Sequence, residues 1–257
     1  MGAGDMSHMS HMSRTLGLLR SLMVYHGIPG RQRRLRRLYR QFVRDGDLVF
    51  DLGAHVGNRT RAFRALGCHV VALDPQPDCA RLLRTLYSRS NRVEVIETAV
   101  SASVGYVDLA ISERHPTLTT TNPIWLADRS RDLLFDGVKW NRPIPVKSTT
   151  LDALVERFGV PSFVKIDVEG AEPHVLTGLT CPLPALSFEY LPGALTGVHR
   201  CIARLTALGT YRFNWSPGET YELANPDWMS GAQIEAVLAT DNAQRRSGDV
   251  YACLEVT

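Results

Sequence analysis

The sequence predicts an α/β fold: a doubly wound, mostly parallel, seven-stranded sheet that ends in an antiparallel C-terminal hairpin. Three observations lead to this fold class. From residue 48 onward, short apolar runs closed by turn residues alternate with amphipathic stretches, as in successive βα units. The first apolar run is followed directly by a glycine turn, where such sheets bind ligands. The 257 residues are 44% apolar, which is enough for one full core.

The apolar runs and the helical periodicities give an order of elements. A strand followed by a helix is expected within 146–159, with Thr149 or Thr150 as the helix N-cap. The other helices are expected at 58–66, 77–87, 171–179, 198–208 and 231–240. Core strands are expected at 48–53, 69–74, 93–100, 161–167 and 185–190, a peripheral one at 105–112, and closing strands at 211–215, 220–224 and 250–256.

The flanking segments define the domain organisation. Residues 1–15 are small and polar with a repeated Ser-His-Met, and we interpret them as a disordered extension. Residues 16–257 are expected to form one domain. Within it, residues 113–145 are rich in Thr, Pro, Asp and Arg and resemble an inserted lid.

Residues 31–44 hold seven arginines and no acid, and apolar residues at spacings of three and four predict a helix with a basic flank. This flank is interpreted as a solvated face, with peripheral contact to an anionic membrane or to nucleic acid as the alternative. No apolar stretch is long enough to span a bilayer, and the N-terminus lacks a signal-peptide pattern. Five scattered cysteines without a CxxC pair favour reduced thiols and a cytoplasmic location.

The first βα turn reads Asp51-Leu-Gly53-Ala-His55-Val-Gly57-Asn58. A dinucleotide enzyme would carry GxGxxG there to hold a pyrophosphate, whereas this turn is DxGxxxG and places a carboxylate beside the glycines. That suits a ligand with an ammonium group, such as S-adenosylmethionine, which also carries a sulfonium. Asp74 ends the second strand, where an acid can accept hydrogen bonds from ribose hydroxyls. For both acids the simpler alternative is an ordinary turn or cap.

Three segments, VFDLGAHVGNRT, TTLDALVERFGVPSFVKIDVEGAEPHVLTGL and SFEY, together resemble the FkbM-type methyltransferase family over roughly residues 40–192. The resemblance implies the class I methyltransferase fold and methylation of a hydroxyl on a polyketide or sugar. It implies that Asp51, Gly53 and Gly57 hold the methionine end of the cofactor and Asp74 the ribose. The sequence has His55 where the family usually has asparagine, and Asp74 where glutamate is common. His55, Asn58 and Thr98 complete the expected cofactor site.

The run KIDVEGAE places four charged residues around the end of the strand predicted at 161–167. Lys165 lies within an apolar strand, so it needs a carboxylate partner. Asp167 and Lys165 are therefore predicted in the floor of the active site, with helix capping as the alternative. Asp167, Glu169 and Glu172 could also bind Mg²⁺ or Ca²⁺, but their spacing fits no metal loop and no metal is predicted.

Methyl transfer to an alcohol requires positioning and a proton acceptor. His115, in the lid-like segment, and Glu189, at the end of the last core strand, are candidates beside Asp167, and His174 is a weaker one. Asn122-Pro123-Ile124-Trp125 resembles the box that amino-methyltransferases use, but that box belongs where KIDVEG stands, so a nucleic-acid acceptor is not favoured.

The sequence thus predicts an S-adenosylmethionine-dependent O-methyltransferase that acts on a natural product, sugar or glycolipid. The alternatives are an RNA or protein methyltransferase, or a cofactor-binding domain without catalysis.

Overall fold

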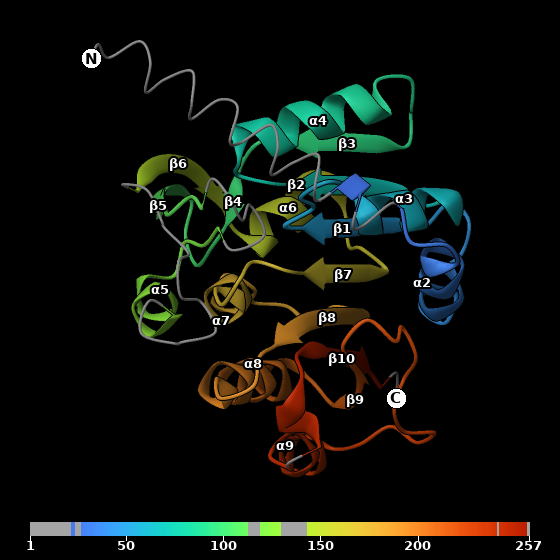
Figure 1. The fold of residues 1–257 in the computed structure, drawn as a ribbon, viewed down its shortest axis with the longest axis vertical. Coiled ribbons are helices and arrows are strands. Elements are labelled where there is room, and N and C mark those ends of the chain that lie inside the picture. Colours follow the sequence, from blue (N-terminus) through green and yellow to red (C-terminus); the bar gives the residue numbers. More distant parts are fainter. Residues whose placement is uncertain (1–21, 24–26, 113–118, 130–142, 241, 256–257) are drawn as a thin grey trace.

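A computed structural model describes residues 22–23, 27–112, 119–129, 143–240 and 242–255 (Figure 1). The predicted extension, residues 1–15, and most of the predicted lid lie outside these ranges. The main sheet has seven strands in the order β3-β2-β1-β7-β8-β10-β9. Their bounds are β1 Leu48–Leu52, β2 His69–Leu73, β3 Val93–Ile96, β7 Phe163–Ile166, β8 Ala185–Tyr190, β9 Tyr211–Pro217 and β10 Gly248–Leu254.

The strand directions confirm the predicted fold class. The five strands β3, β2, β1, β7 and β8 are parallel, whereas β10 is antiparallel to both of its neighbours, β8 and β9. The chain order reverses between β1 and β7. Ligands bind at this topological switch point in open α/β sheets, beyond the carboxyl ends of the strands.

Helices cover both faces of the sheet, because neighbouring strand residues point to opposite faces. Val49 packs with the cluster that contains α2, α3 and α4, whereas Phe50 packs with the cluster under α6, α7, α8 and α9. Strand residues on both faces are apolar, as expected for a buried parallel sheet. The helices are α2 Arg31–Tyr39, α3 Asn58–Ala65, α4 Pro77–Tyr87, α5 Pro123–Arg129, α6 Leu151–Phe158, α7 Glu172–Thr177, α8 Leu195–Leu208 and α9 Gly231–Leu238, with a 3₁₀ turn η3 at Ala243–Arg245.

Three sequence-based boundaries were wrong. The strand expected at 93–100 breaks into β3 and β4 (Ala99–Val100), and β4 joins a second sheet with β6 (Ile144–Thr149) and the peripheral β5 (Gly105–Leu109). Residues 220–224 form no strand, because Tyr221 has a positive φ of 57° and turns toward α2. The basic helix ends at Tyr39, where the chain turns to bury Val43.

Among the described residues, no helix has both the length and the apolar character that a bilayer crossing requires.

The N-cap of α6 gives a test of the local structure. The Thr150 side chain accepts a hydrogen bond from the Ala153 amide, as one of the two predicted caps. Thr150→Ala should lower the free energy of unfolding by about 1 kcal/mol, because an orphan amide loses its partner. Thr150→Ser keeps the hydroxyl and should stay close to the wild type in urea unfolding followed by circular dichroism. Equal losses in both variants would assign the effect to the lost methyl group instead.

Candidate active site

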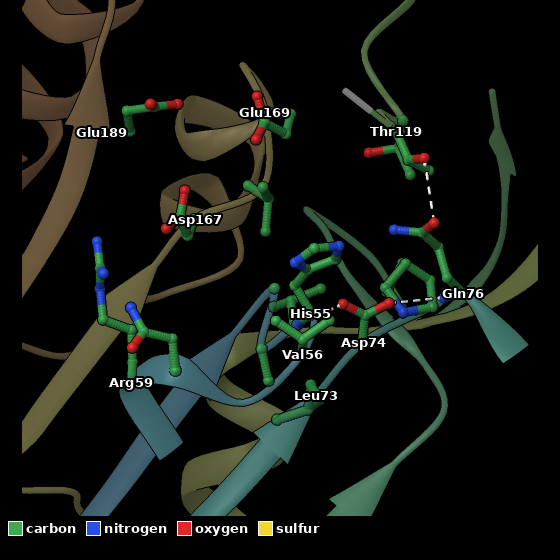
Figure 2. Close-up of a pocket in the computed structure, with 18 of the residues that line it drawn as sticks. His55, Val56, Arg59, Leu73, Asp74, Gln76, Thr119, Asp167, Glu169 and Glu189 are labelled. Carbon is green, nitrogen blue, oxygen red and sulfur yellow. Dashed lines mark hydrogen bonds between the residues drawn. The ribbon is translucent and has the colours of Figure 1, made fainter. Parts of the chain in front are cut away.

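A cavity of about 370 Å³ lies beyond the carboxyl ends of β1, β2 and β7, at the topological switch point (Figure 2). Asp74, Gln76 and Thr119 stand at one end of it, and Asp167, Glu169 and Glu189 at the other, with His55 between the two groups. The cavity also takes in Arg59 and, from the β9 and β10 side, Glu219 and Asp249.

The glycine turn is shaped by the protein packed around it. Gly53 has φ 80° and Gly57 has φ 79°. A side chain at Gly53 would collide with the carbonyl oxygen of Asp167, and one at Gly57 would crowd Leu83 and Tyr87. Both positions therefore need glycine for backbone conformation and for close packing. Gly53 lines the cavity, whereas Gly57 lies behind it.

His55 and Asp74 form the centre of the cavity wall. His55 has a φ of 49°, and its amide donates a 2.8 Å hydrogen bond to Asp74 Oδ2, while the Gln76 amide donates to Oδ1 at 2.9 Å. Burial raises the pKa of Asp74 to about 7, although these two amides stabilise its charge. Burial lowers the pKa of His55 to about 4, so its imidazole is neutral at neutral pH.

Asp51 lies underneath the turn and not on the cavity wall. Its Oδ2 accepts a 2.5 Å hydrogen bond from the Thr60 hydroxyl, and its Oδ1 is buried without a hydrogen-bond partner among the described residues. Burial raises the pKa of Asp51 to about 6, against the effect of the Thr60 hydrogen bond. Asp51 is thus separated from the cavity by the glycine turn, and its predicted contact with the methionine end of the cofactor stays a prediction.

Lys165 is fully buried beneath the cavity and contacts two carboxylates of the cavity lining. Its Nζ lies 2.9 Å from Asp249 Oδ1 and 3.3 Å from Asp167 Oδ2. Burial alone lowers the pKa of Lys165, but Asp167 and Asp249 more than offset it and the pKa is raised, so the amine stays charged. Arg59 lies 3.6 Å from Asp249 Oδ2 and extends this network to α3. Lys165 itself is not among the residues that line the cavity, and it supports the lining residue Asp167 from beneath, so its predicted role in the active-site floor stays a prediction.

Asp167, Glu169 and Glu189 form a carboxylate trio. Each offers an oxygen, and these oxygens all lie within 4.8 Å of one another, close enough to share a metal ion. Burial raises the pKa values of Glu169 and Glu189, and the charges of the neighbouring carboxylates raise them further. Glu172, which the sequence grouped with the first two, instead caps the loop by accepting from the Val168 and Gly170 amides.

A second cavity of about 500 Å³ shares Glu189 with the first. It is bounded by α5, the start of α7, the loop after β8 and the first turns of α8. Asn122, Trp125, His174 and Arg200 line it, so it combines hydrogen-bonding groups with an aromatic wall. Glu189 Oε2 is buried and has no hydrogen-bond partner among the described residues. Glu189 is thus placed to reach ligands in either cavity.

The structure brings most of the predicted site together. His115 lies outside the described residues, and Asp249, Arg59 and Glu219 were not predicted. Asp249 could have been found as a lone acid beginning an apolar strand, because the buried Lys165 required a distant carboxylate. The predicted residues that line the first cavity are Gly53, His55, Asn58, Asp74, Thr98, Asp167 and Glu189.

Comparison with known proteins gives a family match. The model of the methyltransferase FkbM domain matches residues 51–189, more than half of the chain. No curated protein matches the sequence.

Several solved structures share the fold at low sequence identity. An O-methyltransferase from Bacillus cereus in complex with SAH is 14% identical, with 93% of this chain and 90% of that one covered and a TM-score of 0.45. The [4+2]-cyclase SpnF is 13% identical, with 95% and 97% covered and a TM-score of 0.43. Precorrin-6Y C5,15-methyltransferase from Geobacter metallireducens is 12% identical, with 87% of each chain covered and a TM-score of 0.41. Likenesses this distant say nothing about the reaction.

The Lys165 network predicts a large and partly reversible loss of stability. Lys165→Met should lower the free energy of unfolding by about 3–5 kcal/mol, because two carboxylates are left near an apolar side chain. Adding Asp249→Asn to the same chain should recover part of that loss, since one of the uncompensated charges is removed. Urea unfolding of the wild type, both single variants and the double variant measures the coupling. Strictly additive losses would contradict a direct Lys165–Asp249 interaction.

Proposed function

The chain belongs to the FkbM methyltransferase family, and from this premise we propose that it transfers a methyl group from S-adenosylmethionine to a hydroxyl oxygen of a natural product, sugar or glycolipid. The observation that carries the cofactor assignment is the charge of the first cavity. Six acidic side chains line it, whereas Arg59 is the one cation among its described lining residues and His55 is neutral. Lys165 and Arg59 offset the charge of Asp249 and Asp167, and burial favours the protonated forms of Asp74, Glu169 and Glu189, but none of these acids supplies the positive charge that a pyrophosphate requires. Such a site favours a cationic sulfonium and disfavours the pyrophosphate of a dinucleotide.

Several described groups fit the parts of this cofactor. Asp74, at one end of the cavity, would hold the ribose hydroxyls. Asn58 Nδ2 and Arg59 Nε are buried without hydrogen-bond partners among the described residues, and they suit the methionine carboxylate. When bound, S-adenosylmethionine supplies a methyl group that is already strongly electrophilic. The remaining task of the protein is to orient the acceptor and to take its proton.

We assign the proton acceptor to Glu189 and the acceptor site to the second cavity. Glu189 borders both cavities and has a buried oxygen with no partner among the described residues. Burial, and in addition the nearby carboxylates, hold the pKa of Glu189 well above the usual range, which makes it a stronger base than an isolated glutamate. Asp167, which is held in place by Lys165, would contribute to this raised pKa through its negative charge. The mixed polar and aromatic wall of the second cavity suits a compact polyhydroxylated molecule.

Cofactor binding tests the first half of the proposal. Isothermal titration should show one S-adenosylhomocysteine site per chain and no binding of NADH. Because the pKa of Asp74 is about 7, its carboxylate gains a proton as the pH falls through 7, and affinity should fall with it. Asp74→Asn should weaken binding roughly ten- to a hundredfold and flatten this pH dependence, since hydrogen bonds to a charged acceptor are worth about 1.5–3 kcal/mol.

Asp78→Asn is the matched control, because Asp78 lies on α4 outside the cavity and pairs with Arg81. It should leave both affinity and pH dependence unchanged. Tight NADH binding without a response to S-adenosylhomocysteine would overturn the cofactor assignment.

Turnover measurements test the assignment of Glu189 as the proton acceptor. A screen of sugars and extracts with methyl-labelled cofactor first identifies a hydroxyl acceptor, which then serves as the substrate. Glu189→Gln should lower the single-turnover rate by about 10²–10⁴ while S-adenosylhomocysteine affinity changes by less than a few-fold. In the wild type the rate should rise with pH above the range of an ordinary glutamate, because the raised pKa keeps Glu189 protonated longer. A loss under about threefold would remove Glu189 as the base.

Filling the second cavity tests its role separately. Gly197 lines it, and an added Cβ would meet only Pro173 at 3.7 Å. Gly197→Leu should therefore lower kcat/KM roughly tenfold or more by excluding the acceptor, with cofactor affinity intact. Ala203→Leu, on the exposed side of the same helix, is the control. Unchanged kcat/KM in Gly197→Leu would place the acceptor elsewhere.

A further inference from the structure

The helices α2 and α3 lie side by side (Figure 1), and both carry arginines at exposed positions. Neither helix contains an acidic residue. Arg33, Arg34 and Arg37 are exposed on α2, Arg40 is exposed directly after its end, and α3 adds Arg61 and Arg64. We refer to these six arginines as the basic face.

Several arginines elsewhere on the surface are paired with acids, whereas Arg89, Arg200, Arg245 and Arg246 are exposed at scattered positions without an ion pair among the described residues. Arg84 pairs with Glu97 and Arg157 with Glu94, each at 2.8–2.9 Å, and Arg81, Arg92 and Arg212 also have acidic partners. Within the described ranges, by contrast, Arg33, Arg34, Arg37 and Arg40 have no ion pair. Their charge is therefore directed to solvent, where it attracts anions.

Core packing and polar contacts hold the helix α2, which carries most of the basic face, against the rest of the fold. On its inner side, Leu35, Leu38 and Tyr39 are buried in the core. Gln32 donates hydrogen bonds to the main chain and side chain of Asn58, and Arg31 pairs with Glu219. Because Asn58 and Glu219 line the first cavity, the first turn of α2 stands beside the cavity wall.

Exposed apolar side chains precede this face. Met23 is 69% exposed and Ile28 is 44% exposed, in the segment directly before α2. Apolar side chains next to a row of basic residues are typical of surfaces that lie on a bilayer, where the apolar groups enter the headgroup boundary and the cations face anionic lipids.

We propose that the basic face, with Met23 and Ile28, docks this protein on an anionic phospholipid surface. Guanidinium groups match phosphate geometry, so the arginines would bind the headgroups. Nucleic acid carries the same phosphates, but its recognition also uses aromatic stacking, and the described part of α2 and α3 exposes no aromatic side chain. The apolar pair therefore favours lipid. The proposal does not depend on methyl transfer.

Sedimentation with vesicles tests the docking on the full chain. The protein should bind vesicles of phosphatidylcholine with phosphatidylglycerol, bind pure phosphatidylcholine at least tenfold more weakly, and dissociate as salt screens the charges. The variant Arg33→Gln, Arg37→Gln, Arg40→Gln should lose roughly tenfold or more in partitioning. Met23→Ser with Ile28→Ser should weaken binding at constant charge.

A control removes the same charge elsewhere. Arg81→Gln, Arg84→Gln, Arg157→Gln takes away three paired arginines and should bind anionic vesicles like the wild type. Thermal melting confirms that each variant is folded. Failure to bind anionic vesicles would overturn the proposal, as would equal losses in the two triple variants. Tight binding of duplex or single-stranded RNA without vesicle binding would assign the basic face to nucleic acid instead.

Discussion

The structure depends on one constraint: a lysine in the middle of a buried strand must keep its charge. Lys165 does so by holding Asp249 from β10 and Asp167 from the end of β7. A cation without partners at this depth would be strongly unfavourable. The same contact ties the parallel half of the sheet to its antiparallel closing strand and fixes Asp167 at the floor of the carboxylate trio. One electrostatic requirement thus links the core to the site.

The arrangement of charged groups in the site is unfavourable for the stability of the fold. Three carboxylates lie within one small volume, and burial together with mutual repulsion raises the pKa values of Glu169 and Glu189. Glu169 also takes a left-handed conformation with φ 53°, which non-glycine residues rarely adopt. Strain and repulsion of this kind persist where function requires them. The rigid support is supplied nearby, by Glu172 on the loop amides and by Lys165 below.

Local sequence patterns predicted the alternating strands and helices, but they did not predict contacts between residues that lie far apart in the sequence. The strands expected at 48–53 and 69–74 and the helix expected at 77–87 follow from hydrophobic periodicity and turn residues, which act over a few positions. The need of Lys165 for a carboxylate also followed from the sequence, but its partner Asp249 did not, because β10 enters the sheet between β8 and β9. For the same reason Glu189, and not Glu172, completes the carboxylate trio. Sequence spacing cannot show which acids converge across strands.

Crowded carboxylates also explain how a glutamate could serve as a base for an alcohol. A lone carboxylate is a weak acceptor for a hydroxyl proton, whereas each negative neighbour raises the affinity of Glu189 for protons. When Glu189 takes the proton, its repulsion with Asp167 and Glu169 is relieved in the same step. Lys165 acts in the opposite direction, because its positive charge beside Asp167 lowers the pKa values of Glu169 and Glu189, although burial and the neighbouring carboxylates outweigh it. The buried lysine thereby limits how far the pKa values of the carboxylate trio rise.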